Sequence, residues 1–332
     1  MAAAQLRKVV IADKFSKPHE AALRKLGLEV TANPDLKDAA LKAAIPGVEI
    51  LIVRSTKVTA DILSAADRLK LIIRAGAGVD TIDVPAASAR GIPVANCPGT
   101  NSLAVAELVL GLILALDRRI PENVAALQAG KWNKKEFSKA DGLAGKTLGI
   151  IGLGQIGRAV AVRAKAFGLK LLGWDKWCPI RAGEVGIDEC PAELLDLASR
   201  SDIVTCHLAL SAESRHLLGR DFFARMKPRA ILINASRGEI VDTPALVEAV
   251  KTKGLRVGLD VYEGEPATPE AELPPQLFEL ARLPGVFGTH HIGASTEQAQ
   301  EAVADETVRI VRAFLADGSV PNCVNAKETA RR

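Results

Sequence analysis

The stretch TLGIIGLGQIGRAVA, residues 147–161, is the best starting point for interpreting the chain. It begins as a short apolar run typical of a buried strand and ends in a helical pattern. Between the two lies a GxGxxG motif, residues 152–157. In that setting the first glycine permits a tight turn, the second lets backbone approach a pyrophosphate, and the third lets the helix pack on the strand. The stretch therefore predicts a phosphate-binding turn between a parallel strand and its helix.

An acidic residue follows the next strand-like run, KLLGW of residues 170–174. Asp175 comes after Gly157 at close to the spacing, roughly 20 residues, at which a carboxylate binds ribose hydroxyls. The same carboxylate would repel a 2′-phosphate, so we expect NAD rather than NADP, although the basic Lys176 would soften that preference. The alternative for Asp175 is an ordinary turn residue. The residues expected to hold the cofactor at the turn are Gly152, Gly154, Gln155, Ile156 and Gly157.

Short apolar runs alternate with helical patterns along most of the chain, which predicts parallel sheets covered on both faces. Helical patterns at 18–26 and 60–66 separate some of these runs, and a final helix is expected to open at Ser295 with a Ser295–Gln298 capping box. The expected strands are residues 8–12, 49–54, 70–74 and 92–96 in a first group, and 147–152, 170–174, 203–208, 230–235, 256–261 and 286–290 in a second.

Bulk composition excludes several classes of protein. The chain has 332 residues, 48% of them apolar and 25% charged, which is typical of a globular protein of two domains. Its formal charge of +4 comes from scattered basic residues, so we expect no nucleic-acid partner. The uninterrupted apolar run 108–116 is far shorter than the ~20 residues that a bilayer requires, so we expect no membrane span.

The cysteines are dispersed, form no CxxC pair and have no metal-ligand spacing, so we expect reduced thiols and no metal site. They are Cys97, Cys178, Cys190, Cys206 and Cys323. The N-terminal sequence MAAAQLRKVVIAD has no secretory leader. Together these features predict a cytoplasmic protein.

Three residues beyond the cofactor motif have complementary chemistry: Arg237 in NASRGEIVD, Glu265 in LDVYEGEP and His291 in THHIGAST. Each follows a predicted strand closely, at the edge of a parallel sheet where ligands bind. Oxidation of a secondary alcohol needs a base for the hydroxyl proton, a partner that orients the base, and a cation for a substrate carboxylate. We expect these three to fill those roles. Any one of them alone would be an ordinary surface or core residue, and His290 is the rival base.

The whole chain resembles the D-2-hydroxyacid dehydrogenase family, and most of all its members that oxidise 3-phosphoglycerate. The resemblance implies two doubly wound parallel-sheet α/β domains. A Rossmann-type NAD-binding domain, residues 100–291, would be inserted into a flavodoxin-like substrate-binding domain, residues 1–99 and 292–332. Ala104 and Ala209 depart from the family pattern, but neither lies in the catalytic segments. The motifs that carry the resemblance are RAGAGVDTID (74–83), GTNSLAVAEL (99–108), LAGKTLGIIGLGQIGRAVA (143–161) and the three catalytic segments.

The resemblance also assigns roles to individual residues. It makes His291 the acid and base, Glu265 its partner, and Arg237 the clamp for the carboxylate and carbonyl. Asp260 would hold the nicotinamide carboxamide, and backbone amides at Ala77–Val79 would bind the substrate carboxylate. We expect Tyr262 and Trp174, like His19 and His216, to be packing or surface residues. The remaining candidates are His207 and Ala235 for the cofactor, and Ala77, Gly78, Val79 and Asn101 for the substrate.

A phosphorylated substrate would need further cations. Arg54 and Arg74 end the runs EILIVR and KLIIR, so both are expected at the same sheet edge as residues 77–79. Lys134 and Lys135 lie in GKWNKKEF, which resembles the segment that reaches across a dimer in the phosphoglycerate-oxidising members. The alternative is that all four are solvated surface charges.

A homodimer is also expected. The helix predicted at 101–119 is apolar on nearly every face, more than one small domain is expected to cover. We therefore expect two copies to associate through this helix and the polar arm of residues 128–145.

Three other functions remain open on this sequence. Reduction of glyoxylate or hydroxypyruvate uses the same three catalytic residues. Formate dehydrogenases share the fold but carry glutamine where this chain has Glu265. NAD(H)-sensing corepressors also share it, yet are expected to carry additional partner-binding segments beyond a tail such as residues 325–332. Because the sequence ends at 332, feedback control by serine through an added C-terminal domain is not expected.

Overall fold

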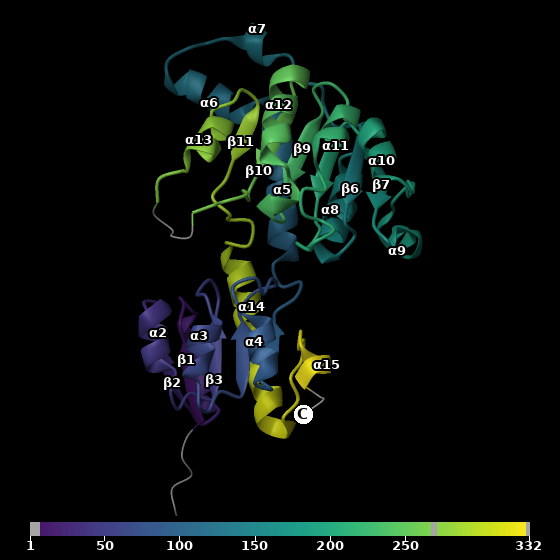
Figure 1. Cartoon of the computed structure of the whole chain (residues 1–332). Coiled ribbons are helices and arrows are strands. Elements are labelled where there is room, and N and C mark those ends of the chain that lie inside the picture. The colour runs from purple at the N-terminus through teal and green to yellow at the C-terminus, as the bar shows by residue number, and fades with distance from the viewer. Residues whose placement is uncertain (1–6, 267–270, 330–332) are drawn as a thin grey trace, which may run out of the picture. The chain divides into compact units, whose positions relative to one another are not determined.

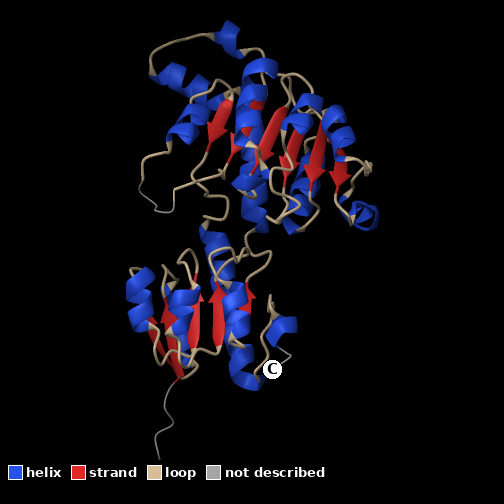
Figure 2. Ribbon diagram, viewed as in Figure 1, coloured by secondary structure: helices blue, strands red, loops and turns tan. Residues whose placement is uncertain are grey.

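A computed structural model describes residues 7–266 and 271–329 of the chain. Expectations that rest on residues 1–6 or 330–332 lie outside the described part. The chain divides into two compact units, one formed by Met1–Asn101 with Ser295–Arg332 and the other by Ser102–Ala294 (Figures 1 and 2). Each is an α/β unit built on its own parallel sheet.

The first unit contains a five-stranded parallel sheet in the order β2-β1-β3-β4-β5. This is the flavodoxin-like order, as expected. One strand, β2, was not expected from the sequence, because its half-exposed edge position leaves only a weak alternation of apolar residues. The strands are β1 (Arg7–Ile11), β2 (Leu28–Ala32), β3 (Ile50–Val53), β4 (Leu71–Arg74) and β5 (Val94–Asn96).

Helices cover both faces of this sheet and bury it. Leu23 of one helix and Ile310 of another pack on one face, while Leu41 and Leu63 pack on the other, all of them fully buried. The final segment is tied to β5, because the Asn325 side chain accepts the Val94 N–H at 2.8 Å. The helices are α1 (Lys17–Lys25), α2 (Asp38–Ala44), α3 (Ala60–Ser64), α4 (Val84–Ala89), α14 (Glu297–Asp317) and α15 (Ala326–Thr329).

The start of α14 differs from the expected capping box at Ser295. Thr296 is the N-cap, because its hydroxyl accepts the Ala299 N–H at 3.1 Å. The helix therefore begins at Glu297, one residue later than a helix capped by Ser295 would begin. Both hydroxyl residues satisfy the sequence preference for a cap, and only the geometry distinguishes them.

The second unit contains a six-stranded parallel sheet in the order β11-β10-β9-β8-β6-β7. The order matches the Rossmann arrangement without the strand beyond β7 and with β11 added at the opposite edge. The chain passes from β6 to β7 on one side and to β8 on the other, so the loops after β6 and β8 meet where the strand order reverses. The strands are β6 (Thr147–Ile151), β7 (Lys170–Trp174), β8 (Ile203–Cys206), β9 (Ile231–Asn234), β10 (Arg256–Leu259) and β11 (Val286–Gly288).

Two apolar clusters bury the faces of this sheet. Val109 and Val160 belong to the cluster on one face, and Phe222, Leu246 and Leu280 belong to the cluster on the other. The helices are α5 (Ser102–Arg118), α6 (Ile120–Gln128), α7 (Lys134–Phe137), α8 (Gln155–Ala166), α9 (Cys178–Val185), α10 (Leu194–Arg200), α11 (Arg220–Arg225), α12 (Thr243–Lys253) and α13 (Pro275–Ala281), with a 3-10 turn at Gly238–Ile240.

Helix α5 is covered mainly by its own unit. Val109 and Ile113 have no exposed surface, and the helix packs on α8, β9 and β10. Most of the helix is thus covered within its own unit, although Leu103 remains 47% exposed, so its apolar character alone does not require a second copy of the chain. Among the described residues, no helix combines the length and the apolarity that crossing a bilayer requires.

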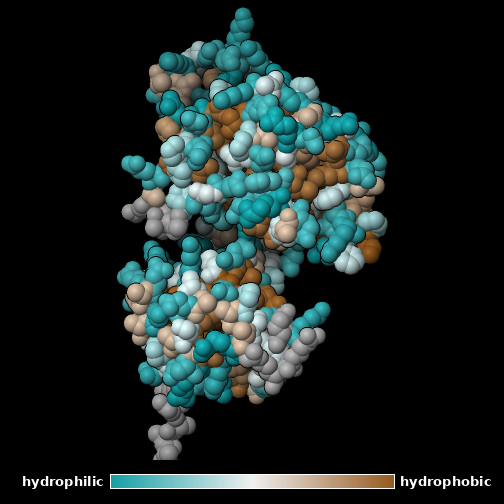
Figure 3. Space-filling model, viewed as in Figure 1, coloured by the Kyte–Doolittle hydropathy of each residue, from teal (hydrophilic) through white to brown (hydrophobic). Residues whose placement is uncertain are grey.

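Exposed apolar side chains gather instead just after α5. On the face that Figure 3 shows, patches of apolar residues (brown) lie among polar residues (teal) in both units. Helix α6 exposes Ile120, Val124 and Leu127, and Trp132 just beyond it is 82% exposed. Helix α6 and Trp132 therefore carry apolar surface that a second copy of the chain could cover.

A disulfide joins Cys178 and Cys190, which corrects the expectation that all cysteines are reduced thiols. Helix α9 begins at Cys178, and the chain then returns to β7 through a parallel bridge between Leu172 and Glu189. This return places the two Cα atoms 6.0 Å apart although 12 residues separate them. Sequence spacing could not reveal the pair, because the cysteines meet only through the sheet.

Candidate active site

The GxGxxG turn closes tightly after β6. Gly152 has a φ of +92°, and its N–H donates to the Trp174 carbonyl at 2.9 Å. A Cβ on Gly152 would lie 2.9 Å from the His207 carbonyl group, and a Cβ on Gly157 would lie 2.0 Å from the Gly152 oxygen. Side chains at these two positions would force the turn open, so both glycines are required by close packing.

Gly154 lies differently. A Cβ there would meet no atom of the protein within 4 Å, so internal packing does not explain this glycine. Gly154 is the N-cap of α8 and has no side chain to bond the first N–H groups of the helix. Open space beside uncapped helix N–H groups fits a pyrophosphate, which is stabilised by those donors and by the positive end of the helix dipole.

Asp175 is fixed against the same turn. Its Oδ2 accepts the Leu153 N–H at 2.8 Å, and its Oδ1 accepts the Trp177 N–H at 2.8 Å. Each carboxylate oxygen can accept a further bond, so the group fits a ribose with two free hydroxyls. Arg181, which the sequence reasoning missed, donates to the Leu153 carbonyl at 3.1 Å from α9. The region around Asp175 therefore carries more positive charge than Lys176 alone indicated.

His207 and Ala235 follow β8 and β9 at the same sheet edge. The His207 N–H donates to the Ile151 carbonyl at 2.7 Å, and its Nε2 lies 2.9 Å from the Thr205 hydroxyl. Burial lowers the pKa of the His207 imidazole to about 3, so the ring is neutral at physiological pH. His207 is thus a packing and hydrogen-bonding group beside the glycine turn, not a titrating one.

His291 and Glu265 form a hydrogen-bonded pair. The His291 Nδ1 lies 2.7 Å from the Glu265 Oε1, and both side chains remain partly exposed. The bond to Glu265 raises the pKa of His291 against the opposing effect of burial. Burial raises the pKa of Glu265, but the bond to His291 and its charge outweigh this effect, and the net shift is downward. The pair therefore favours the imidazolium form, with the His291 Nδ1 held by Glu265.

Asp260 holds the loop that carries His291. Its Oδ1 accepts the Ile292 N–H at 2.8 Å and the Thr289 hydroxyl at 2.7 Å, while its Oδ2 accepts the Gly293 N–H at 2.8 Å. These bonds support His291 in a left-handed conformation, with a φ of +52°, that is costly for a residue other than glycine. The resemblance did not indicate this loop-holding role, and the Asp260 Oδ2, which accepts one bond here, can accept a second.

Arg237 completes the group within the same unit. It follows β9, and its Nη1 donates to the Ser236 carbonyl at 2.7 Å. Its positive charge lowers the pKa of both Glu265 and His291, so it lies within electrostatic reach of the pair. The structure thus brings the three expected residues together on loops after β9, β10 and β11. Both His291 and its rival His290 are exposed, and it is His291 that forms the bond to a carboxylate partner.

The candidate substrate residues of the first unit lie at the ends of β3 and β4. These strands are neighbours, with Val53 opposite Arg74, so Arg54 and Arg74 leave the same sheet edge. The Arg74 guanidinium lies against Gly76, where a Cβ would meet its Nη1 at 1.6 Å, and residues 77–79 follow directly. The Asn96 side chain donates to the Ala77 carbonyl at 2.5 Å and steadies this loop.

The other candidates lie apart from this loop in the sequence. Lys134 and Lys135 open the short helix α7 of the second unit and are exposed. Asn101 directly precedes α5 and has a buried side-chain oxygen with no hydrogen-bond partner among the described residues. That oxygen is free to accept a bond from a ligand or from water.

Comparison with known proteins places this site in a family. Residues 110–293 match the family described as D-isomer specific 2-hydroxyacid dehydrogenase, NAD binding domain. The chain is 42% identical over 328 residues to a D-3-phosphoglycerate dehydrogenase of Methanocaldococcus jannaschii, covering 96% of this chain and 61% of that protein. It therefore spans only about 60% of the length of the phosphoglycerate dehydrogenases that it matches.

Two further proteins match over nearly their full length. A hydroxypyruvate reductase of Thermotoga maritima is 44% identical over 291 residues, covering 86% of this chain and 90% of that protein. The crystal structure of D-lactate dehydrogenase from Aquifex aeolicus, complexed with NAD and lactic acid, aligns with a TM-score of 0.83 and 29% identity over 94% of this chain and 96% of that one. The chain therefore belongs to the D-isomer specific 2-hydroxyacid dehydrogenase family, and its second unit contains the NAD-binding domain.

Proposed function

We propose that the protein is an NAD-dependent D-2-hydroxyacid dehydrogenase that oxidises 3-phosphoglycerate to 3-phosphohydroxypyruvate. The observation that carries the reaction class is the 2.7 Å bond between His291 and Glu265, formed beside Arg237 in the unit that holds the glycine turn. A basic residue with a carboxylate partner and a nearby guanidinium suits the oxidation of an acid that bears a hydroxyl group next to its carboxylate. Steady NADH formation from such an acid tests the proposal and would exclude a purely NAD(H)-sensing protein.

Each of the three catalytic residues has a separate role in the proposed reaction. Neutral His291 accepts the hydroxyl proton of the substrate, and Glu265 stabilises the imidazolium that forms. Arg237 binds the substrate carboxylate and polarises the developing carbonyl. NAD, when bound, supplies the acceptor for the hydride from C2. In the opposite direction, the imidazolium of His291 returns its proton to the oxygen of the 2-oxo acid.

The phosphorylated substrate is proposed from two arginines and the relatives. Arg54 and Arg74 end neighbouring strands, and Arg74 contacts the residue that precedes the proposed carboxylate-binding loop 77–79. Guanidinium groups bind phosphate with strong, charge-assisted bonds. The M. jannaschii relative supports 3-phosphoglycerate, whereas the T. maritima relative supports hydroxypyruvate or glyoxylate as the second candidate.

Substrate preference should respond to these arginines. Arg54→Ala or Arg74→Ala is expected to raise KM for 3-phosphoglycerate by about ten- to a hundred-fold, since a charge-assisted bond contributes roughly 1.5–3 kcal/mol. The KM for an unphosphorylated 2-hydroxy acid should hardly change. Kinetics with phosphohydroxypyruvate, hydroxypyruvate and glyoxylate check this, with Arg68→Ala as a control at the other end of β4. A wild type that prefers glyoxylate would establish the reductase alternative.

Cofactor preference should depend on Asp175. The wild type is expected to use NAD with a higher kcat/KM than NADP, because the Asp175 carboxylate would repel a 2′-phosphate. Asp175→Ala should lower the ratio of kcat/KM for NAD to kcat/KM for NADP, because the repulsion of the 2′-phosphate and the bonds to the ribose are lost together. The positive charges of Lys176 and Arg181 would then be unopposed by this carboxylate. Lys176→Ala is the matched control and should widen the ratio. Equal or better use of NADP by the wild type would refute this role of Asp175.

We also propose that two copies of the chain associate through helix α6 and the arm of residues 128–145. Helix α6 exposes Ile120, Val124 and Leu127, and Trp132 of the arm is 82% exposed, so large apolar side chains gather on this segment. Light scattering at micromolar concentration should give a dimer. Val124→Glu with Trp132→Ala should shift it toward the monomer, while Ile180→Glu on α9, exposed but outside the arm, should not. A monomeric wild type would contradict the proposal.

A further inference from the structure

Tyr262 is the only tyrosine of the chain and lies on the loop between Asp260 and Glu265. Its ring packs beside a core cluster of the second unit, which is why the sequence indicates only a packing residue. Its hydroxyl, however, lies 3.0 Å from the Thr289 carbonyl and 3.2 Å from the Leu259 carbonyl. Thr289 comes two residues before His291. A hydrogen bond from this hydroxyl to the Thr289 carbonyl therefore links the loop that carries Glu265 to the loop that carries His291.

The Tyr262 hydroxyl packs so closely on the backbone before His291 that residue 288 has no space for a side chain. A Cβ on Gly288 would lie 2.3 Å from the Tyr262 oxygen, while the nearest ring carbons would be at 3.5 and 3.9 Å, which are ordinary contacts. Only the hydroxyl, and not the ring, thus excludes a side chain at residue 288. The tyrosine oxygen is seated directly on the backbone of β11.

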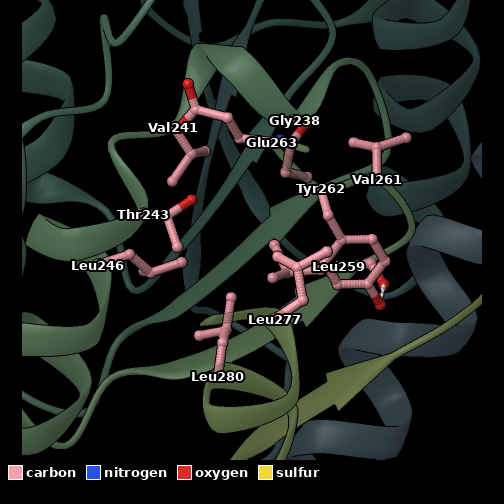
Figure 4. Close-up of a pocket in the computed structure, with 11 residues that line it drawn as sticks. Gly238, Val241, Thr243, Leu246, Leu259, Val261, Tyr262, Glu263, Leu277 and Leu280 are labelled. Carbon is pink, nitrogen blue, oxygen red and sulfur yellow. Dashed lines mark hydrogen bonds between the residues drawn. The ribbon is translucent and has the colours of Figure 1, made fainter. Parts of the chain in front are cut away.

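The third catalytic loop also rests on Tyr262. A Cβ on Gly238, which follows Arg237, would lie 1.9 Å from the Tyr262 carbonyl carbon and 2.2 Å from the Glu263 nitrogen. Figure 4 shows Tyr262 in the wall of a small pocket together with Gly238 and Leu259. The segment after Arg237 is therefore packed on the peptide between Tyr262 and Glu263. One residue contacts all three segments that carry the catalytic group.

We propose that Tyr262 is a positioning residue, whose hydroxyl sets the distance between Glu265 and His291 by holding the loops after β10 and β11 together. Its catalytic consequence rests on the proposed function. The pair needs such support because both side chains are partly exposed, at 51% for His291 and 37% for Glu265, and are not fixed by burial. Burial, together with nearby negative charge, raises the pKa of Tyr262 to about 12, so the hydroxyl remains a donor throughout the working range of pH.

Loss of the hydroxyl should change the titration of His291. The bond to Glu265 raises the pKa of His291, Asp260 raises it further, and Arg237 lowers it. Loosening the loop weakens the first of these effects, so the pKa of His291 should fall toward its ordinary value. In the oxidation direction the acid limb of the pH profile should then move to lower pH, because neutral His291 is the base.

The experiment compares wild type with Tyr262→Phe, Gly288→Ala and the double variant. Tyr262→Phe should lower kcat about tenfold, in line with loss of one hydrogen bond at a positioned group, with KM for NAD unchanged. Gly288→Ala should be worse, since its methyl group displaces the hydroxyl. The double variant should recover to the level of Tyr262→Phe alone, because the added methyl group then meets only ring carbons at ordinary distance.

NMR titration of the His291 ring provides a readout that needs no substrate, with His291→Gln used to assign the signal. A lowered pKa in Tyr262→Phe and Gly288→Ala, and no further lowering in the double variant, supports the inference. An unchanged pKa in Tyr262→Phe overturns it, as does equal damage by Gly288→Ala with and without the hydroxyl. If the wild type oxidises no 2-hydroxy acid, the proposed function fails, and the titration still decides the link between Tyr262 and His291.

Discussion

His291→Ala is expected to lower kcat for oxidation of the 2-hydroxy acid by ~10²–10⁴-fold, the usual contribution of a general acid or base. Affinity for NADH should stay the same, because the cofactor turn at residues 152–157 is built from other elements. Steady-state kinetics combined with NADH fluorescence titration separates the two effects. The loss should appear in both directions of the reaction, since the same ring accepts the proton in one and donates it in the other.

The pH dependence of the same step has a defined sign. Glu265 raises the pKa of His291, and oxidation needs the neutral ring, so kcat/KM for oxidation should rise as pH increases through this raised pKa. Reduction needs the imidazolium and should decline over the same interval. Glu265→Gln removes the charge that favours the imidazolium, so both limbs should move to lower pH.

His290→Ala is the matched control, because it removes a neighbouring imidazole that has no carboxylate partner among the described residues. It should retain near-normal turnover. The choice of base would be wrong if His290→Ala abolished turnover while His291→Ala preserved it.

Features that are local in sequence could be predicted well. The strand, the glycine turn and the helix at residues 147–161 are neighbours along the chain, so their spacing specifies them directly. The loops of Arg237, Glu265 and His291 could be placed together because parallel strands end at one sheet edge. Strand β2 was missed because an edge strand with one exposed face has little apolar signal, and its existence depends on pairing with β1.

Features that depend on contacts between distant segments could not be predicted. The disulfide of Cys178 and Cys190 requires the return of the chain to β7. Asp260 is identified as the support of the His291 loop only by its three bonds. The sequence indicates only a core aromatic residue at Tyr262, and its further role emerges from its close contacts with Gly238 and Gly288. The chemical groups of the site were thus visible in the sequence, whereas the residues that hold them in place were not.

Arg237→Ala is expected to be at least as damaging to kcat/KM as His291→Ala, because it removes both the charge and the fork that positions the substrate carboxylate. The KM for the 2-hydroxy acid should rise and kcat should fall together, since the same guanidinium also polarises the carbonyl that forms. Arg237→Lys keeps the charge but not the bidentate geometry, so it should recover only part of the loss.

The electrostatic part of this prediction can be measured without turnover. The charge of Arg237 lowers the pKa of His291 and of Glu265, so His291 in Arg237→Ala should titrate at higher pH than in the wild type. In Arg237→Lys its pKa should stay close to the wild-type value. Added guanidinium ion should restore some activity to Arg237→Ala and none to His291→Ala, because only the first variant lacks a cation. If Arg237→Ala retained its KM for the acid and its His291 pKa, the residue would be neither the carboxylate clamp nor an electrostatic neighbour of the base.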